Sequence, residues 1–99
     1  MQFKFMKNQI CNAIQNPKIL EFYYENYYRT VEPHSLGVST AGKEVLSAYQ
    51  VSGQSGSTIP AWKLFDLNKI TSLTESGNVF GGSEPGYQRN SSKMASIKC

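Results

Sequence analysis

Two runs of strand-forming residues, 20–24 and 27–32, constrain the fold of this chain more than any other feature. Polar and apolar positions alternate in the first run, and both runs are rich in aromatic and β-branched residues, which favour strands. Only Glu25 and Asn26 separate the two runs. A break of two polar residues between such runs is typical of a hairpin, so the sequence predicts a β-hairpin that turns at these residues.

The residues that follow extend this hairpin into a meander. Pro33 has no backbone N–H to donate, so we expect it to end the second strand or to lie at a sheet edge. Two further extended runs cover residues 36–40 and 44–52. The turn between them contains Gly42, which is free to adopt a positive φ. This part of the chain is therefore expected to form four short strands joined by tight turns.

A short amphipathic helix is expected before the meander. Apolar residues recur there at steps of three and four, which is the period of one helix face. The helix should end at Asn16, because Pro17 disfavours the helical conformation of the residue before it. The apolar stripe consists of Phe3, Met6, Ile10, Ala13 and Ile14.

The expected elements after the meander are shorter. A loop rich in glycine and serine leads to a fifth strand over residues 61–65 and then to a helical turn over residues 66–70. Residues 72–74 are expected to add a last strand. Residues 90–99 are small and polar, so we expect them to form a frayed tail.

These elements predict a mainly β fold. One helix followed by five or six short strands favours a small SH3/Sm-like β-barrel with an N-terminal α-helix, because closure removes the unpaired edges of short strands. We expect this barrel to occupy residues 1–80, and an extended, partly flexible C-terminal segment to occupy residues 81–99. The 99 residues, with a hydrophobic fraction of 39%, are typical of a single globular domain.

Composition limits the cellular compartment, the kind of ligand and the cofactors that we expect for this chain. The net charge of +3 is compatible with an anionic ligand, and no apolar run approaches the ~20 residues of a membrane span. No signal peptide is evident, so a cytoplasmic location is expected. In that compartment Cys11 and Cys99 are expected to be free thiols, with a disulfide between them as the alternative. The chain has a single histidine, and we expect no metal and no cofactor.

Three blocks of the sequence resemble the WYL domain, a bacterial family with an Sm-like SH3 β-barrel. They are YRTVEPH at residues 28–34, GKEVLSAY at residues 42–49 and KLFDLNKI at residues 63–70. The family carries R-x-V-E-P-H, G-R-W-Y-L-V-A-Y and R-x-F-R-L-D-R-I in the same order and with similar gaps. The resemblance covers residues 10–80, including the preceding helix.

The blocks also differ from the family pattern. Glu44 and Val45 stand where the family has Trp and Tyr, and Lys63, Asp66 and Lys69 stand where it has arginines. Lysine keeps the charge but loses the planar fork that matches a phosphate. The resemblance implies a ligand-sensing or regulatory binding module of bacterial or phage origin. Its ligand would be a nucleotide or a short single-stranded nucleic acid, and its role would lie in transcription or phage defence.

Seven basic and aromatic residues are candidate ligand-binding residues. Cationic groups suit the phosphates of such a ligand, and flat rings suit stacking on its bases. Arg29 has an alternative structural role, in which it pairs with Glu21 or Glu32 and stacks on tyrosines. The binding interpretation requires Arg29, His34 and Lys63 to face one concavity; if they face unrelated sides, a scaffolding role is favoured. The candidates are Arg29, His34, Lys63, Lys69, Tyr24, Tyr49 and Trp62.

The alternative function is protein–protein interaction without a small ligand. The tyrosine-rich hairpin, with Tyr27 and Tyr28, would then form a homodimer or bind a regulatory protein partner, since tyrosine and arginine are frequent interface anchors. We do not expect an enzyme. Glu32 and His34 have no evident nucleophile near them, and Ser35 directly follows His34, which does not suit a catalytic triad.

Overall fold

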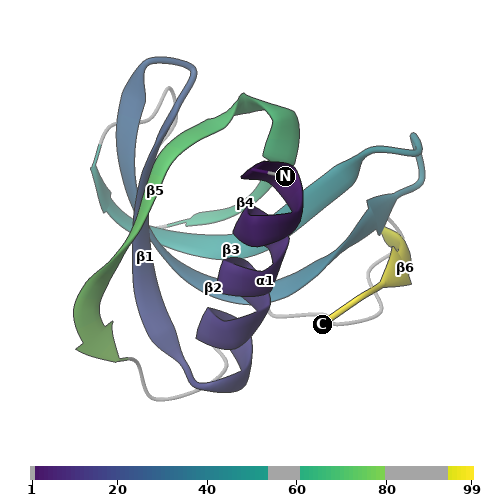
Figure 1. The fold of residues 1–99 in the computed structure, drawn as a ribbon. Helices are drawn as coiled ribbons and strands as arrows, with labels where there is room; N and C mark the ends of the chain where they lie inside the picture. Colours follow the sequence, from purple (N-terminus) through teal and green to yellow (C-terminus); the bar gives the residue numbers. More distant parts are fainter. Residues whose placement is uncertain (1, 54–60, 80–93) are drawn as a thin grey trace.

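The structure is a computed structural model that describes residues 2–53, 61–79 and 94–99. A single helix among these residues lies across a curved antiparallel sheet (Figure 1). The mainly β class and the N-terminal helix are therefore confirmed. The elements are α1 (Gln2–Gln15), β1 (Lys18–Tyr24), β2 (Tyr27–Ser39), β3 (Glu44–Gly53), β4 (Ala61–Asp66), the 3-10 turn η1 (Leu67–Lys69), β5 (Ile70–Val79) and β6 (Met94–Ile97).

The sheet is open, which corrects the expected closure into a barrel. Five strands follow the order β4-β3-β2-β1-β5, and β6 pairs with β2 off this path. Within the described residues no ladder joins β4 to β5. The turn η1 carries the chain from one of these edge strands to the other, and β5 is irregular, with register shifts against β1 and a positive φ of 54° at Ser72. The described residues therefore form an open sheet with β4 and β5 as its two edge strands.

The predicted hairpin is confirmed. β1 and β2 are antiparallel, with Tyr24 opposite Tyr27. Glu25 and Asn26 form the turn with φ of 52° and 68°, which are the positive values that a two-residue hairpin turn requires. The second predicted turn also forms, and its Gly42 has a φ of 81°.

The expectation that Pro33 ends a strand is wrong. β2 continues through it to Ser39, so the meander has three strands where four were expected. Pro33 lies opposite Ala48 and Ser35 lies opposite Ser47, which makes His34 the extra residue of a β-bulge. A bulge interrupts the ladder locally, and the missing N–H of proline is tolerated there.

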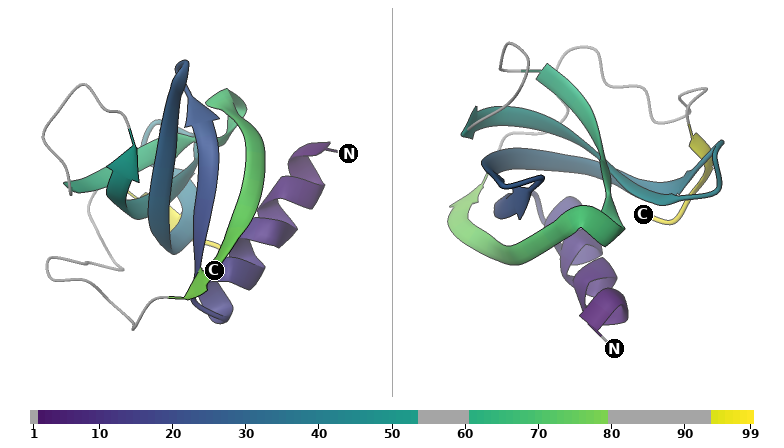
Figure 2. Two further views of the ribbon diagram at one scale, coloured as in Figure 1. Left: turned by 90° about the vertical axis from the view of Figure 1, so that its left-hand side faces the viewer. Right: turned by 90° about the horizontal axis from the view of Figure 1, so that it is seen from above.

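The C-terminal residues correct two further expectations. Residues 94–97 form β6 on β2, so this part of the predicted frayed tail is ordered. Cys11 and Cys99 form a disulfide, with their Cα atoms 5.7 Å apart, and the expectation of free thiols is wrong. β6 and the Glu25–Asn26 turn lie at opposite ends of the long strand β2 (Figure 2).

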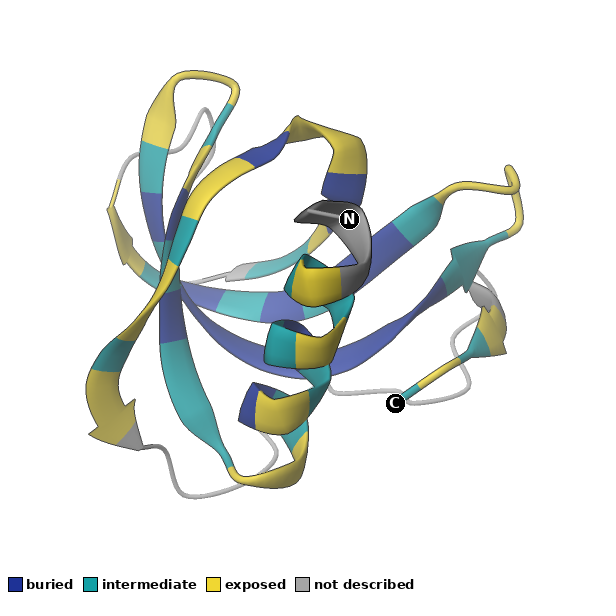
Figure 3. Ribbon diagram, viewed as in Figure 1, coloured by how far each residue is buried: buried dark blue, intermediate teal, exposed yellow. Residues whose placement is uncertain are grey.

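The core lies between α1 and the sheet, and the middle of β2 is its longest buried run (Figure 3). Ile10 and Ala13 of the predicted helix stripe are fully buried, while Met6 and Ile14 pack against the core at its margin. The side chain of Phe3 lies outside the described part of the structure. The sheet and η1 contribute Leu20, Phe22, Val31, Leu36, Leu46, Ala48, Phe65, Leu67 and Ile70.

Candidate functional site

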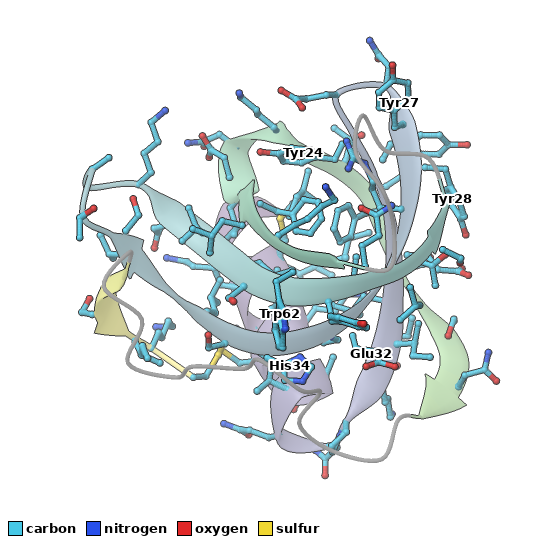
Figure 4. All side chains as sticks on the ribbon, turned by 180° about the vertical axis from the view of Figure 1, so that it is seen from behind. Tyr24, Tyr27, Tyr28, Glu32, His34 and Trp62 are labelled. Atoms are coloured by element: carbon cyan, nitrogen blue, oxygen red, sulfur yellow. A yellow bond between two sulfur atoms is a disulfide. The ribbon has the colours of Figure 1, made fainter. Side chains whose placement is uncertain are left out.

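The seven predicted site residues do not share one surface. Arg29 lies opposite the core residue Phe22, so it points to the core face of the sheet. Trp62 lies opposite Tyr49, and both belong to the outer face. Figure 4 shows Trp62 and His34 together, well away from Tyr24 and Tyr27 near the hairpin turn. The requirement that Arg29, His34 and Lys63 face one concavity is therefore not met. This counts against a ligand site built from all three residues and favours the scaffolding role, and it leaves the core-face group around Arg29 as the remaining candidate.

The first group surrounds the guanidinium of Arg29, and we call it the Arg29 cluster. It consists of Tyr24, Tyr27, Arg29, Gln50 and Phe65. Arg29 is only 5% exposed. Its Nη1 donates to the Gln50 side-chain oxygen at 3.1 Å, and its Nη2 donates to the Tyr24 carbonyl at 3.4 Å. The guanidinium carbon lies 5.4, 5.5 and 5.8 Å from the ring centres of Tyr24, Tyr27 and Phe65, within cation–π range.

The charge of Arg29 is not balanced by an acid in the described part of the chain. It forms no ion pair there, so the expected alternative of pairing with Glu21 or Glu32 is not seen. The buried Nε also has no hydrogen-bond partner among the described residues. Burying a charge without a counter-charge costs several kcal/mol. The cluster thus holds a desolvated cation that a bound anion would stabilise.

Two predicted lysines lie near this cluster. Lys63 lies opposite the core residue Ala48, on the same face of β4 as Phe65. Lys69 lies in η1 and pairs with Glu25 of the hairpin turn at 3.6 Å. The hydroxyl of Tyr24 ties the same hairpin to β4, because it accepts from the backbone N–H of Asp66 at 3.0 Å.

The second group lies on the outer face, and we call it the His34 cluster: Glu32, His34, Tyr49 and Trp62. His34 Nδ1 is 2.9 Å from the Glu32 carbonyl oxygen, and because a carbonyl oxygen only accepts, the contact corresponds to the tautomer whose Nδ1–H donates to it. The His34 ring meets Trp62 edge-on at 4.7 Å, and Trp62 meets Tyr49 in the same way at 5.4 Å. These contacts give the three predicted residues a packing role, and the adjacent Ser35 is buried.

The expected stacking of Arg29 on tyrosines is seen with Tyr24 and Tyr27, whereas sequence reasoning missed Gln50 and Phe65 as neighbours of Arg29. Gln50 had a detectable signal. It follows Leu46 and Ala48 at two-residue steps, so it is a polar residue at a position that the strand period places in the core. A buried amide needs partners, and Arg29 is one of them.

The hairpin has a separate outer surface formed by tyrosines. Tyr23 and Tyr28 lie opposite each other with ring centres 5.4 Å apart. The hydroxyl of Tyr28 hydrogen-bonds to the Glu21 carboxylate, which raises the pKa of Tyr28 above its ordinary value because the carboxylate favours the protonated phenol.

The residues that the structure describes form neither a metal site nor a membrane-spanning helix. No group of three or more histidine, cysteine, aspartate or glutamate side chains there is arranged to hold a metal ion. None of the described helices has the length and apolar character needed to cross a membrane.

Comparisons of the chain with protein-family models, with curated proteins and with solved structures give no match, so the resemblance to WYL domains stays a prediction from the residues.

Proposed function

We propose that this protein binds a phosphate-bearing ligand, a nucleotide or a short single-stranded nucleic acid, at the Arg29 cluster. The observation that carries the proposal is the buried guanidinium of Arg29, which has no acidic partner among the described residues. Guanidinium groups recognise phosphate oxygens through short, charge-assisted hydrogen bonds. A phosphate that reaches the guanidinium would supply a negative charge that no acid among the described residues supplies.

The rings around Arg29 suit the rest of such a ligand. Tyr27 is 43% exposed although it contacts the guanidinium, so it is the part of the cluster that can turn outward without opening the core. An outward Tyr27 offers a flat face to a base, and such stacking is worth about 1–3 kcal/mol. Lys63, on the same face of β4 as Phe65, adds positive charge there, whereas the charge of Lys69 is balanced by Glu25 of the hairpin turn.

This proposed site is smaller than the one expected from the sequence. It keeps Tyr24, Arg29, Lys63 and Lys69 and omits the residues of the His34 cluster, whose contacts are accounted for by packing on the outer face. The ligand-sensing role, in transcription or in phage defence, rests on the WYL resemblance and belongs to the proposal. The cytoplasmic location, where nucleotides are abundant, also belongs to the proposal.

Replacing Arg29 by methionine tests the proposal. Thermal unfolding is followed with inorganic phosphate, ATP or a short oligothymidylate added in increasing amounts. We expect at least one of them to raise the Tm of the wild-type protein in proportion to RT ln(1 + [L]/Kd). Arg29→Met should weaken this binding about 10–100-fold, because a hydrogen bond to a charged group contributes about 1.5–3 kcal/mol.

The stability of the Arg29 variants, measured without ligand, separates a binding role of Arg29 from a structural role. Without ligand, Arg29→Met should keep the fold but lose about 1–3 kcal/mol of stability, because the buried Gln50 side-chain oxygen loses this donor, an effect offset in part by the removal of a buried charge that has no acidic partner among the described residues. Arg29→Lys is the matched control, because lysine keeps the positive charge of Arg29 but lacks the planar guanidinium that matches a phosphate. A wild type that responds to none of the three probes, or an Arg29→Met variant that binds as the wild type does, would contradict the proposal.

A second candidate function is self-association through the hairpin. It is favoured by the exposure of Tyr23, at 47%, which lies beside Tyr28 on the outer face of the hairpin. If the hairpin forms a dimer, Tyr23→Ser should shift the mass measured by light scattering from dimer to monomer while the fold persists. Phe5→Ser, which changes an exposed apolar residue on α1, is the control and should leave the mass unchanged. A wild type that is monomeric at all concentrations would exclude this candidate.

A further inference from the structure

The strand β6 is held to β2 by few contacts. It has four residues, and its register covers only Gly37, Val38 and Ser39, with an irregularity between the last two. Three backbone hydrogen bonds continue this pairing: Leu36 N–H to Cys99 O at 2.9 Å, Lys98 N–H to Leu36 O at 2.6 Å, and Cys99 N–H to Leu36 O at 3.1 Å.

The burial of two of the four β6 side chains, Ser96 and Ile97, is described, and neither is fully buried. Ser96 and Lys98 are exposed, and Ile97 is half-buried. Cys99 packs against the margin of the core, and its sulfur is bonded to Cys11 of α1. Short terminal strands with few buried side chains open at low free-energy cost. The disulfide is therefore the strongest link between β6 and the rest of the molecule.

The edge of β2 that receives β6 is shaped for this strand. A Cβ atom on Gly37 would overlap the Ser96 carbonyl oxygen and would approach the Cα of Ile97 to 2.9 Å. Only a glycine at position 37 allows the two backbones to lie this close. The β6 sequence is thus an occupant that the structure shows to fit this edge.

We propose that the Cys11–Cys99 disulfide controls whether β6 stays on its own β2 or exchanges between two copies of the chain. A dithiol reductant transfers two electrons and two protons to the disulfide, which gives two thiols on the protein and a disulfide on the reductant. β6 then detaches in local openings and leaves the N–H of Leu36 and the β6-facing backbone groups of residues 37–39 unpaired, while the pairing of β2 with β3 persists. An unpaired edge accepts another strand, and β6 of a second copy has the sequence that fits.

Hydrogen exchange of single amides tests the release. In the reduced protein the Leu36 amide should exchange on the order of 100-fold faster than the Phe22 amide. The Leu36 amide is exposed when β6 alone detaches, whereas the Phe22 amide is exposed only when the whole domain unfolds. Low concentrations of urea should accelerate Phe22 but not Leu36. In the oxidised protein Leu36 should be protected. Equal exchange of both amides in the reduced protein would overturn the proposal, since β6 would then be part of one cooperative unit.

A covalent trap tests the exchange. Cys11→Ser and Cys99→Ser chains, one of them labelled with ¹⁵N, are mixed and oxidised, so that no chain can close its own disulfide. Docking of β6 between copies places Cys99 of one chain beside Cys11 of the other and should enrich the labelled–unlabelled dimer above the share given by random pairing. Adding Gly37→Ala to the Cys99→Ser chain, which is the acceptor, should abolish the enrichment. If the labelled–unlabelled dimer forms only at the share given by random pairing, the proposed exchange of β6 between copies is overturned.

Discussion

Loss of the Cys11–Cys99 disulfide should lower the free energy of unfolding by about 4–5 kcal/mol, because the crosslink restricts a very long loop of the unfolded chain. The two cysteines are 88 positions apart in the sequence. The expected loss is a large fraction of the 5–15 kcal/mol that stabilises a typical domain. Urea unfolding of the Cys11→Ser variant, followed by the fluorescence of Trp62, measures this loss.

Two controls accompany this measurement. Cys99→Ser should give the same loss as Cys11→Ser, and dithiothreitol should destabilise the wild type but neither variant. A loss of less than about 1 kcal/mol in both variants would mean that the unfolded chain is already compact enough for the crosslink to add little.

Truncation of Phe22 to alanine should destabilise the protein by about 3–5 kcal/mol. Phe22 is fully buried and meets the ring of Phe65 edge-on, with ring centres 5.0 Å apart. Its removal loses apolar burial and leaves a cavity between β1 and β4. Urea or thermal unfolding measures the change, which should also lower the Tm by many degrees.

Tyr23 is the matched control for Phe22, because it follows directly on β1 and points away from the core. It is 47% exposed, and its ring contacts only Tyr28 among the described aromatic rings. Tyr23→Ala should therefore cost about 1 kcal/mol or less. Equal losses for the two variants would contradict the placement of the core on the Phe22 side of β1.

Local features of this fold were predictable because local chemistry determines them. The hairpin follows from the alternation before Glu25 and Asn26, the helix end from Asn16-Pro17, and the second turn from Gly42. β4 and the helical turn after it also begin where their residues indicate. In each case the residues that indicate the feature lie within a few positions of the residues that form it.

The features that sequence reasoning missed depend on contacts between distant residues. Residues 94–97 have no strong strand pattern of their own, and they are ordered by the edge of β2 and by the bond of Cys99 to Cys11. A propensity argument weighs only neighbours in sequence, so it assigned this segment to a tail. The disulfide was missed because cysteine pairing was judged from the expected compartment and not from a distance in space.

The candidate site was predictable only in part, because the face of each residue depends on the path of β2. Tyr24, Arg29, Lys63 and Lys69 lie on or beside the core-face cluster, while His34 lies with Trp62 on the outer face. The assumption that Pro33 ends a strand left the orientation of His34 undetermined. A continuous β2 with a bulge at His34 fixes it.

The bulge at His34 also constrains where residues can be inserted into the chain or deleted from it. Arg29 and Val31 point inward before it, whereas Leu36 points inward after it, so the extra residue reverses the alternation along β2. Deletion of one codon here would turn Leu36 to solvent and move Gly37 away from the position where Ser96 approaches it. Insertions and deletions that a surface loop would accept are therefore excluded from the centre of this strand.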